Sequence, residues 1–461
     1  MPTFLKKSLQ WAKTFKTFIY LNPNEIPYPH EPFLHVLAVG EKKQLSSNNA
    51  DKIEGKTSFD KLYNFWSNQT QSKLSYIFGY FNYDLKNELE NLSSNNLDNL
   101  GFPEFYFFEP KYLLFFDRNG NLLIDKTKQE NQFDDKILSN LIVEIEEIKL
   151  ESKSIYNSKL KPLLFSEASQ PLSVSSPTIK SSKPKINCRF TEEEYLQTVE
   201  IIKNHIVEGD VYELNLCVEF FIEKLELNPL EAYQELCKIS KMPFSSFLKI
   251  TIEGNEKYAL CASPERFLNK TGTKLISQPI KGTVKRGKTE AEDEENKNYL
   301  KTSEKEQAEN MMIVDLVRND LARSSEIGST HVSEMFGIYT FQQVHQMIST
   351  VEATLHKDKN WSEAIKNAFP MGSMTGAPKI KATELIEKYE KTKRGLYSGS
   401  IGYISPDGDF DFNVVIRTLF YDEFSKYASF QVGGAITYDS DPKSEWEECL
   451  LKAKAIRSLF E

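Results

Sequence analysis

Arginine is scarce in this chain, and its cysteines form no paired motif. Arginine occurs only nine times among 461 residues, and lysine supplies the rest of the 57 basic side chains. An arginine in such a chain can mark a position that needs a planar, forked donor, although codon bias explains much of the scarcity. The five cysteines are odd in number and include no C-x-x-C pair. This pattern argues against a disulfide framework or a zinc ribbon and fits a reducing cytosol.

Long hydrophobic runs are absent as well. No apolar stretch reaches the roughly 18 residues that a membrane helix needs. Lys13 and Lys16 interrupt the segment in which a signal peptide would have its apolar core. The net charge is −9, which disfavours nucleic acid as a partner. We therefore expect a cytoplasmic protein that engages neither membrane nor nucleic acid.

The chain divides by composition into three parts. Residues 1–150 are rich in aromatic, strand-like runs, such as 33–40 and 76–84. Residues 151–187 are rich in serine, lysine and proline, which predicts a flexible linker. At Thr191 and Glu194 a capping box begins an amphipathic helix that should end near Gly209. Strands and helices then alternate to residue 461, so 188–461 is predicted to be the catalytic unit, on which 1–150 packs.

Two helices each offer a pair of carboxylates at a spacing of three. Residues 303–323 have apolar positions at a helical period, and Glu306 and Glu309 share one face of that helix. Glu445 and Glu448 repeat the spacing near the C-terminus. Such a set could hold Mg²⁺, which favours carboxylate, water and substrate oxygens. The plainer interpretation is ordinary surface pairing, with Ser303 as a helix cap.

Glycines and basic residues could bind an anion. In the segment 369–391, Gly372 and Gly376 loosen a loop, and Pro378 is expected in the first turn of a helix beside Lys379. Free amide groups at a helix start bind carboxylates. Gly433 and Gly434 form a second pair that is expected to follow a strand. Arg417 lies in a strand-like run and could bind a second carboxylate. Each feature could instead be structural: a loop entry, a β-bulge or an ion pair.

Lys281 and Glu265 are candidates for covalent and acid chemistry. Lys281 stands between an apolar strand and Gly282–Thr283, and Glu265 follows Pro264 at a strand end. A lysine becomes a nucleophile when burial or a nearby cation lowers its pKa. A carboxylic acid with a raised pKa can act as a general acid. Taken singly, both residues are more often structural.

Together these motifs resemble a known family. SPERF, PIKGT, AENMMIVDLVRNDLAR, GSMTGAPKIKA, SGSIGY, IRTL and GGAITYDSDPKSEWEE occur in one order. They closely resemble the chorismate-binding enzymes, which include the anthranilate, aminodeoxychorismate, isochorismate and salicylate synthases. The likeness is strong over 188–461 and weaker before it, where GYFNYDLKNELE resembles the family's N-terminal region. It implies an α/β fold of the α+β type, with large, mostly antiparallel sheets packed as a sandwich and flanked by helices.

Within the family, the lysine of PIKGT resembles the aminodeoxychorismate synthase branch. The resemblance implies that Lys281 is the nucleophile and Glu265 the general acid, and that chorismate and ammonia give 4-amino-4-deoxychorismate. It implies Mg²⁺ as the cofactor, with Glu309 and Glu448 as ligands and Glu306 and Glu445 beside them. The substrate-binding residues that it implies are Gly282, Thr283, Gly376, Ala377, Lys379, Tyr397, Arg417, Gly433 and Gly434.

Two positions depart from the family pattern. Glu213 stands where the isochorismate and salicylate enzymes carry a lysine base and the amine-forming enzymes usually carry glutamine, which counts against activation of water. It adds a carboxylate that could receive ammonium or orient Lys281. Gln346 stands where the family usually has histidine, with His345 one position early. This weighs mildly against anthranilate formation.

The resemblance also implies partners. None of the cysteines lies in a G-x-C-x-G elbow, so ammonia is expected from a separate glutamine amidotransferase subunit. A tryptophan could bind in the N-terminal region, in a structural or regulatory role. Two other readings stay open. One is anthranilate synthase component I, and the other is an inactive scaffold that binds a partner. The second is disfavoured because Lys281, Glu265, Glu309 and Glu448 are all present.

Overall fold

A computed structural model describes residues 1–24, 26, 28–30, 33–68, 74–90, 92–150, 155, 183–342 and 344–461. Most of the linker predicted at 151–187 lies outside these ranges. No helix within them is long and apolar enough to cross a membrane.

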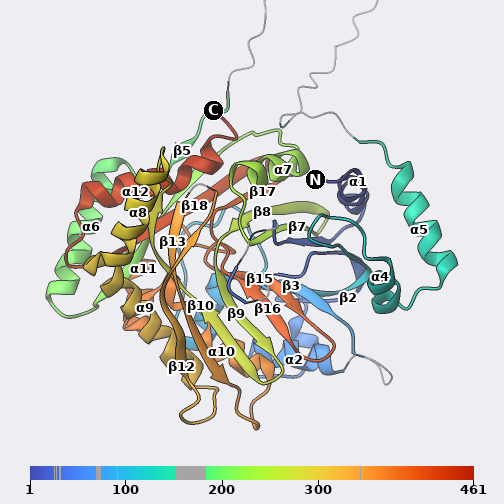
Figure 1. The fold of residues 1–461 in the computed structure, drawn as a ribbon, viewed down its shortest axis with the longest axis horizontal. Helices are drawn as coiled ribbons and strands as arrows, with labels where there is room; N and C mark the ends of the chain where they lie inside the picture. The colour runs from blue at the N-terminus through green and yellow to red at the C-terminus, as the bar shows by residue number, and fades with distance from the viewer. Residues whose placement is uncertain are drawn as a thin grey trace, which may run out of the picture.

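The N-terminal 150 residues contribute four strands and the helices around them (Figure 1). The strands are β1 (Phe18–Asn22), β2 (Val36–Ser46), β3 (Ile77–Phe81) and β4 (Phe105–Phe115). The helices are α1 (Thr3–Ala12), α2 (Ser58–Ser67), α3 (Lys86–Glu90), α4 (Ile124–Asn131) and α5 (Asp135–Glu147), with short 3₁₀ turns η1 (Ala50–Lys52) and η2 (Tyr83–Leu85).

The remainder of the chain adds the larger share of the sheet. Its strands are β5 (Asn187–Cys188), β6 (Glu213–Ile222), β7 (Phe244–Ile252), β8 (Asn255–Ser263), β9 (Arg266–Thr271), β10 (Lys274–Gln278), β11 (Ile280–Lys285), β12 (His331–Thr340), β13 (Val344–Thr354), β14 (Gly376–Ala377), β15 (Ser400–Ile404), β16 (Phe410–Asn413), β17 (Thr418–Asp422) and β18 (Tyr427–Ile436). Its helical elements are α6 (Glu192–Val207), α7 (Pro229–Ile239), α8 (Glu290–Thr302), α9 (Glu304–Ala322), α10 (Trp361–Ala368), η3 (Gly372–Met374), α11 (Lys379–Tyr389) and α12 (Pro442–Arg457).

Hydrogen bonds link the 18 strands of the described ranges into one continuous sheet, and the pairs between named strands are antiparallel. This confirms the predicted fold class. Strands from the two ends of the chain alternate within the sheet: β1 lies between β2 and β7, and β3 lies between β4 and β15. The N-terminal region is therefore joined to the rest by backbone hydrogen bonds as well as by side chains.

The flanking helices follow the sequence pattern closely. The capping box at Thr191 and Glu194 forms, and α6 buries Tyr195, Val199 and Ile202 at helical spacing. In α9 the buried face includes Ile313, Val317 and Leu321, as the period predicted. One large core cluster is crowded with aromatic rings, such as Phe81 stacked near Phe59 at a centroid distance of 5.0 Å. A second lies beneath α6, α7 and α12.

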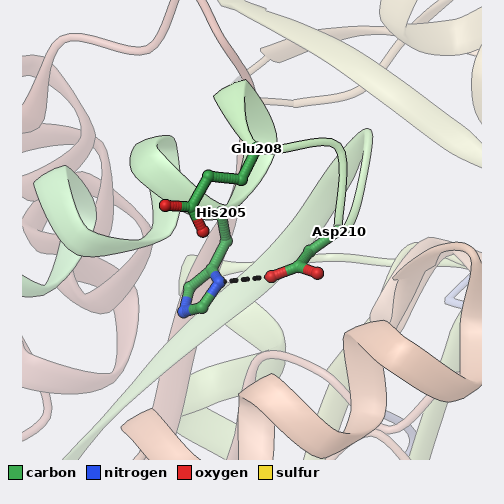
Figure 2. Close-up of side chains that lie close together, drawn as sticks. All are labelled: His205, Glu208 and Asp210. Atoms are coloured by element: carbon green, nitrogen blue, oxygen red, sulfur yellow. Dashed lines mark hydrogen bonds and ion pairs between the residues drawn. The ribbon is translucent and has the colours of Figure 1, made fainter.

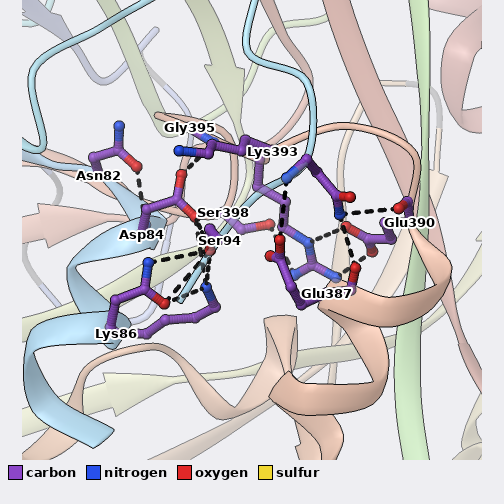
Figure 3. Close-up of polar contacts among 12 residues, drawn as sticks. Asn82, Asp84, Lys86, Ser94, Glu387, Glu390, Lys393, Gly395 and Ser398 are labelled. Atoms are coloured by element: carbon purple, nitrogen blue, oxygen red, sulfur yellow. Dashed lines mark hydrogen bonds and ion pairs between the residues drawn. The ribbon is translucent and has the colours of Figure 1, made fainter. Parts of the chain in front are cut away.

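A polar network also ties residues 82–96 to the segment that follows α11 (Figure 3). The Asp84 carboxylate accepts hydrogen bonds from the Gly395 backbone amide at 3.2 Å and the Ser94 hydroxyl at 3.2 Å, and lies 3.5 Å from the Lys86 ammonium. The Glu387 carboxylate accepts from the Asn95 amide at 2.7 Å. The two regions thus share buried polar contacts as well as strand pairs.

Arg394 lies at the buried end of this network, and its loss is expected to destabilise the fold. Its guanidinium binds the Glu390 carboxylate through two nitrogens, at 2.7 and 3.0 Å, and both side chains are almost fully buried. Arg394→Met would leave Glu390 with an uncompensated buried charge, so we expect a loss of about 3–5 kcal/mol in the free energy of unfolding. Urea denaturation at pH 7 measures it. Arg318→Met, which breaks an exposed pair with Asp315, should change stability by less than about 1 kcal/mol.

Candidate functional site

The strand order brings the sequence motifs to one region. β6 pairs with β14 on one side and β18 on the other, so Glu213 starts a strand that lies between Gly376–Ala377 and Gly433–Gly434. Helix α9 packs on β11, and α12 packs on β18. The lysine strand, both glycine pairs and both carboxylate helices therefore converge.

Lys281 lies among carboxylates. Its ammonium nitrogen is 3.6 Å from Glu309 Oε2 and 3.9 Å from Glu213 Oε2. The side chain is 16% exposed, so most of it is shielded from solvent. Lys281 follows Ile280 in β11, whose pairing with β13 is irregular between Ile280 and Thr283. That irregularity, at Gly282 with φ +90°, occurs next to Lys281 and separates it from the regular ladder.

Glu213 is buried with one oxygen unsatisfied. Its side chain is 1% exposed, and Oε2 accepts no hydrogen bond within the described part of the chain. Burial raises the pKa of this carboxyl group, and nearby Glu309 raises it further, while Lys281 lowers it. A buried oxygen without a donor carries a free-energy penalty. Glu213 is therefore suited to accept a hydrogen bond from a reactant that enters the site.

Glu265 is a buried acid held between two strands. It lies in the break between β8 and β9 and is 4% exposed. Burial raises its pKa to about 7, although a hydrogen bond from the Ser373 hydroxyl at 2.6 Å and the charges of Lys281 and Arg417 lower it. A carboxyl group with a pKa near neutrality is half protonated there, which suits a general acid. The predicted strand-end position is confirmed.

The four carboxylates of α9 and α12 influence one another. Burial raises the pKa of Glu306, and Glu309 and Glu448 raise it further. Burial and Glu448 raise the pKa of Glu445, which also accepts the Ser440 hydroxyl at 2.8 Å. Carboxylates that raise one another's pKa favour a neutralising cation, and hard oxygen donors suit Mg²⁺. The residues present therefore fit a magnesium ion.

Glycines line the space beside these acids. A Cβ at Gly434 would lie 3.1 Å from Glu445 Oε2, and a Cβ at Gly282 would lie 2.9 Å from Glu306 Oε2. At Gly376 a Cβ would meet the Glu213 carbonyl oxygen at 2.2 Å, so only glycine allows this strand contact. Gly433 and Gly434 lie inside β18, so the expectation that they follow the strand was wrong. The sheet continues through them because β6 pairs along their whole length.

Arg417 is a partly buried cation without a carboxylate partner among the described residues. In those residues its guanidinium bonds only the Met242 sulfur, at 3.8 Å, and desolvation lowers its pKa to about 10 while Glu265 raises it. It precedes β17 instead of lying within a strand, and its φ is +51°. A partly buried guanidinium held in this conformation is suited to bind a ligand carboxylate.

The other predicted substrate residues have varied surroundings. Lys379 donates to Asp320 at 2.7 Å and to the Pro370 carbonyl at 2.9 Å, so in the free protein it is a paired lysine at the start of α11. Pro378 is the N-cap of this helix, one position before the expected first turn.

Tyr397 is buried, with its hydroxyl 3.8 Å from the Cys217 sulfur. Thr283 is exposed and accepts the Gln346 amide at 3.4 Å.

Gln346 and His345 point to different partners. The Gln346 carbonyl oxygen is buried and has no hydrogen-bond partner in the described ranges. His345 bonds the Thr340 hydroxyl at 2.9 Å and Asp293 of α8 at 2.9 Å. His345 is thus bound to helix α8, and it does not take the place of the histidine that the family usually has at position 346.

Sequence reasoning missed two residues of this region. Lys452, one turn after Glu448 on α12, binds the Glu448 carboxylate and the Gly433 carbonyl oxygen, both at 2.7 Å. Its position four residues after Glu448 was the available signal. Ser373 lies inside the GSMTGAPK motif, but no spacing rule connects it to Glu265, which is 108 residues earlier.

A separate group of possible metal ligands lies at the C-terminal end of α6 (Figure 2). His205, Glu208 and Asp210 form the one trio in the described ranges whose ligand atoms lie within 4.8 Å of one another. The carboxylates predicted to bind metal are thus more widely spaced. Both ring nitrogens of His205 already have partners, Asp210 at 2.6 Å and the Tyr389 hydroxyl at 2.8 Å. The imidazole of His205 is thus already engaged by two protein side chains.

Comparison with known proteins gives a consistent result. A family model described as chorismate binding enzyme matches residues 16–458. Aminodeoxychorismate synthase component 1 of Bacillus subtilis is 34% identical over 387 residues, covering 83% of this chain and 76% of the relative. The chloroplastic aminodeoxychorismate synthase of Arabidopsis thaliana is 42% identical over 283 residues, or 60% of this chain. The chain spans less than half the length of its plant relatives, 30% for Arabidopsis and 43% for the one from Oryza sativa.

Solved structures share the fold. Anthranilate synthase component I of Streptococcus pneumoniae superposes with a TM-score of 0.71 at 25% identity, covering 94% of this chain and 95% of that one. The menaquinone-specific isochorismate synthase of Escherichia coli gives a TM-score of 0.70 at 16% identity, covering 100% and 92%. At that identity the likeness concerns the fold alone.

Proposed function

Because the chain belongs to the chorismate-binding enzymes, we propose that it is an aminodeoxychorismate synthase component I, which converts chorismate and ammonia to 4-amino-4-deoxychorismate. This reaction replaces the C4 hydroxyl group of the ring by an amino group and releases water. The names of the Bacillus subtilis and plant relatives support the choice of reaction.

One observation carries the proposal. Lys281, a primary amine, lies 3.6 Å from Glu309 and 3.9 Å from Glu213, and its charge also reaches the buried acid Glu265. A nucleophile and a proton donor are therefore present in one site. A family member that added water to the ring would have no use for an amine in this position.

The first chemical step forms a covalent adduct. Lys281 first gives its ammonium proton to the neighbouring Glu213 carboxylate. The neutral amine then attacks C2 of the ring, and the two ring double bonds shift toward C4 as the C4–O bond breaks. The departing oxygen takes the proton of Glu265 and leaves as water. The adduct occupies C2, so water cannot attack that carbon.

The second step releases the enzyme. Ammonia attacks C4, the double bonds shift back, and the bond between C2 and Lys281 breaks, which returns the free lysine. The new ammonium group at C4 loses a proton, which restores the acid form of Glu265. Glu213 presents its unsatisfied oxygen beside Lys281, and we assign it the role of orienting the lysine and receiving the incoming nitrogen. Addition of chorismate and ammonia and loss of water balance the reaction.

Magnesium is the proposed cofactor. Glu309 and Glu448 would hold it, with Glu306 and Glu445 beside them. When bound, the ion would neutralise this acidic group and the ring carboxylate of the substrate. In the free protein Lys452 supplies part of the positive charge that these carboxylates need, and its Coulomb attraction lowers the pKa of Glu448.

The substrate is a dianion, and Arg417 is proposed to bind its second carboxylate. The partly buried guanidinium lacks a carboxylate partner among the described residues, and a bidentate contact would satisfy it. The amides around Gly376 and Gly433–Gly434 would complete the clamp. Lys379 would join it only by leaving Asp320, so we assign it to holding the loop.

Ammonia is proposed to come from a separate glutamine amidotransferase subunit. The five cysteines are unpaired, and four of them are buried, which fits neither a disulfide framework nor a glutaminase nucleophile. They fit the reducing cytoplasm, where we place the reaction. A tryptophan in the N-terminal region, structural or regulatory, stays part of the proposal.

The experiment that tests this function is a product assay. Purified protein is incubated with chorismate, Mg²⁺ and ¹⁵N-ammonium, and the products are identified by mass. We expect 4-amino-4-deoxychorismate that carries the label. Anthranilate with pyruvate as the main products would instead identify an anthranilate synthase component I, and isochorismate would identify water as the nucleophile.

A further inference from the structure

Among the described residues, Ser373 is the one side chain outside the predicted set that hydrogen-bonds the carboxyl group of the proposed general acid. It lies in η3, within the loop between α10 and α11, and its hydroxyl donates to Glu265 Oε1 at 2.6 Å. The two residues come from distant parts of the chain. The contact therefore depends on where the fold holds this loop.

The loop is held by the strand that carries Glu213. The Asn215 side-chain amide donates to the Ser373 carbonyl oxygen at 2.5 Å, and its backbone amide donates to the Thr375 carbonyl oxygen at 2.8 Å. Arg394 donates to the Met374 carbonyl oxygen at 2.5 Å and to the Asn215 carbonyl oxygen at 2.9 Å. The backbone on both sides of Ser373 is thus fixed to β6.

Glu265 and Ser373 line one pocket with mostly apolar walls. Phe267, Met371 and Val414 are among its lining residues. The Ile280 backbone amide also hydrogen-bonds the Glu265 carboxyl group, and among the described residues Ser373 supplies the side-chain hydrogen bond to it. The Ser373 hydroxyl is therefore well placed to fix the orientation of the Glu265 carboxyl group.

We propose that Ser373 is a positioning residue, which holds the Glu265 carboxyl group in the orientation that delivers its proton to the departing hydroxyl group. This inference rests on the proposed function for the reaction, but the contact itself belongs to the free protein. Ser373 acts through Glu265 and need not touch the substrate.

The charges that face Glu265 determine how a pH profile will respond. They are Lys281 from β11, Arg417 before β17, the phenol of Tyr28, the Arg266–Asp411 pair of β9 and β16, and the Asp320–Lys379 pair of α9 and α11. None of these changes in a Ser373 variant. Ser373 lowers the pKa of Glu265 because its hydroxyl donates to the ionised form.

The test compares Ser373→Ala with Ser373→Thr in a pH profile of kcat/KM. Loss of the donor keeps Glu265 protonated to higher pH, so the alkaline limb of Ser373→Ala should move up by about one pH unit. The plateau should fall by about tenfold because the acid is no longer aligned. Ser373→Thr keeps the hydroxyl and should restore both. Thr375→Val is the matched control, since that hydroxyl bonds only the Met371 and Gly372 carbonyl oxygens.

The outcomes separate a positioning role from a structural one. A fall in the plateau without a shift of the limb in Ser373→Ala, or the same shift in Thr375→Val, would overturn the inference. Crystal structures of the free wild type and Ser373→Ala give a readout that needs no turnover. We expect Glu265 to be rotated in the variant, and an unchanged carboxyl group would also overturn the inference. A wild type that makes no 4-amino-4-deoxychorismate would contradict the proposed function, while the crystal structures would still decide the role of Ser373.

Discussion

Replacing Lys281 with alanine is expected to slow formation of 4-amino-4-deoxychorismate by about three orders of magnitude or more, the scale seen when a covalent nucleophile is removed. The variant retains Glu265 and the substrate clamp, so chorismate should still bind. It loses the amine that attacks C2, and no other lysine lies close to both Glu309 and Glu213 in the described ranges. Single-turnover assays with saturating ammonium measure the effect on the chemical step.

Lys285→Ala is the matched control for this variant. Lys285 ends the same strand, and its side chain is exposed. Its activity should stay within about twofold of the wild type, as expected for a solvated surface residue. Lys281→Ala with near-normal turnover would exclude the covalent route, whatever the product.

Removal of divalent metal by a chelator is expected to abolish turnover, and Glu448→Gln should raise the Mg²⁺ concentration needed for half-maximal activity by at least about tenfold. The amide removes one negative charge from an oxygen-rich group that includes Glu306, Glu309 and Glu445. Titration of activity with Mg²⁺ measures the requirement.

Glu447→Gln controls for the change of charge on α12. Glu447 and Glu448 are both exposed, but consecutive residues of a helix do not share a face, so Glu447 is not grouped with the other carboxylates. Its Mg²⁺ requirement should equal that of the wild type. Full activity in a chelator, or an equal effect of both variants, would refute the assignment of the metal to these carboxylates.

Local signals predicted much of the fold. The capping box of α6, the apolar period of α9 and the C-terminal helix are properties of short segments, and each is confirmed. The pairing of β1 with β7 and of β3 with β15 joins residues more than 200 positions apart. Such contacts depend on tertiary packing, so no local pattern could predict them. For the same reason Gly433 and Gly434 were wrongly expected outside their strand.

The resemblance of the motifs to a known family predicted more of the site than residue types and their spacing did. The motifs gave Lys281, Glu265 and the four carboxylates, and the structure brings Lys281 to Glu309 and Glu213. They could not reveal that Glu213 has an unsatisfied oxygen or that Lys379 already has Asp320 as a partner. Hydrogen-bond satisfaction depends on the arrangement of neighbours in space, which spacing along the chain does not encode.

Mass spectrometry of the intact protein tests the central claim most directly. The protein is mixed with chorismate and Mg²⁺ in the absence of ammonia, quenched rapidly and digested to locate any modification. The account predicts a mass gain equal to chorismate less one water, placed on Lys281 and discharged when ammonium is added. Unmodified Lys281 throughout a reaction that still yields 4-amino-4-deoxychorismate would contradict it.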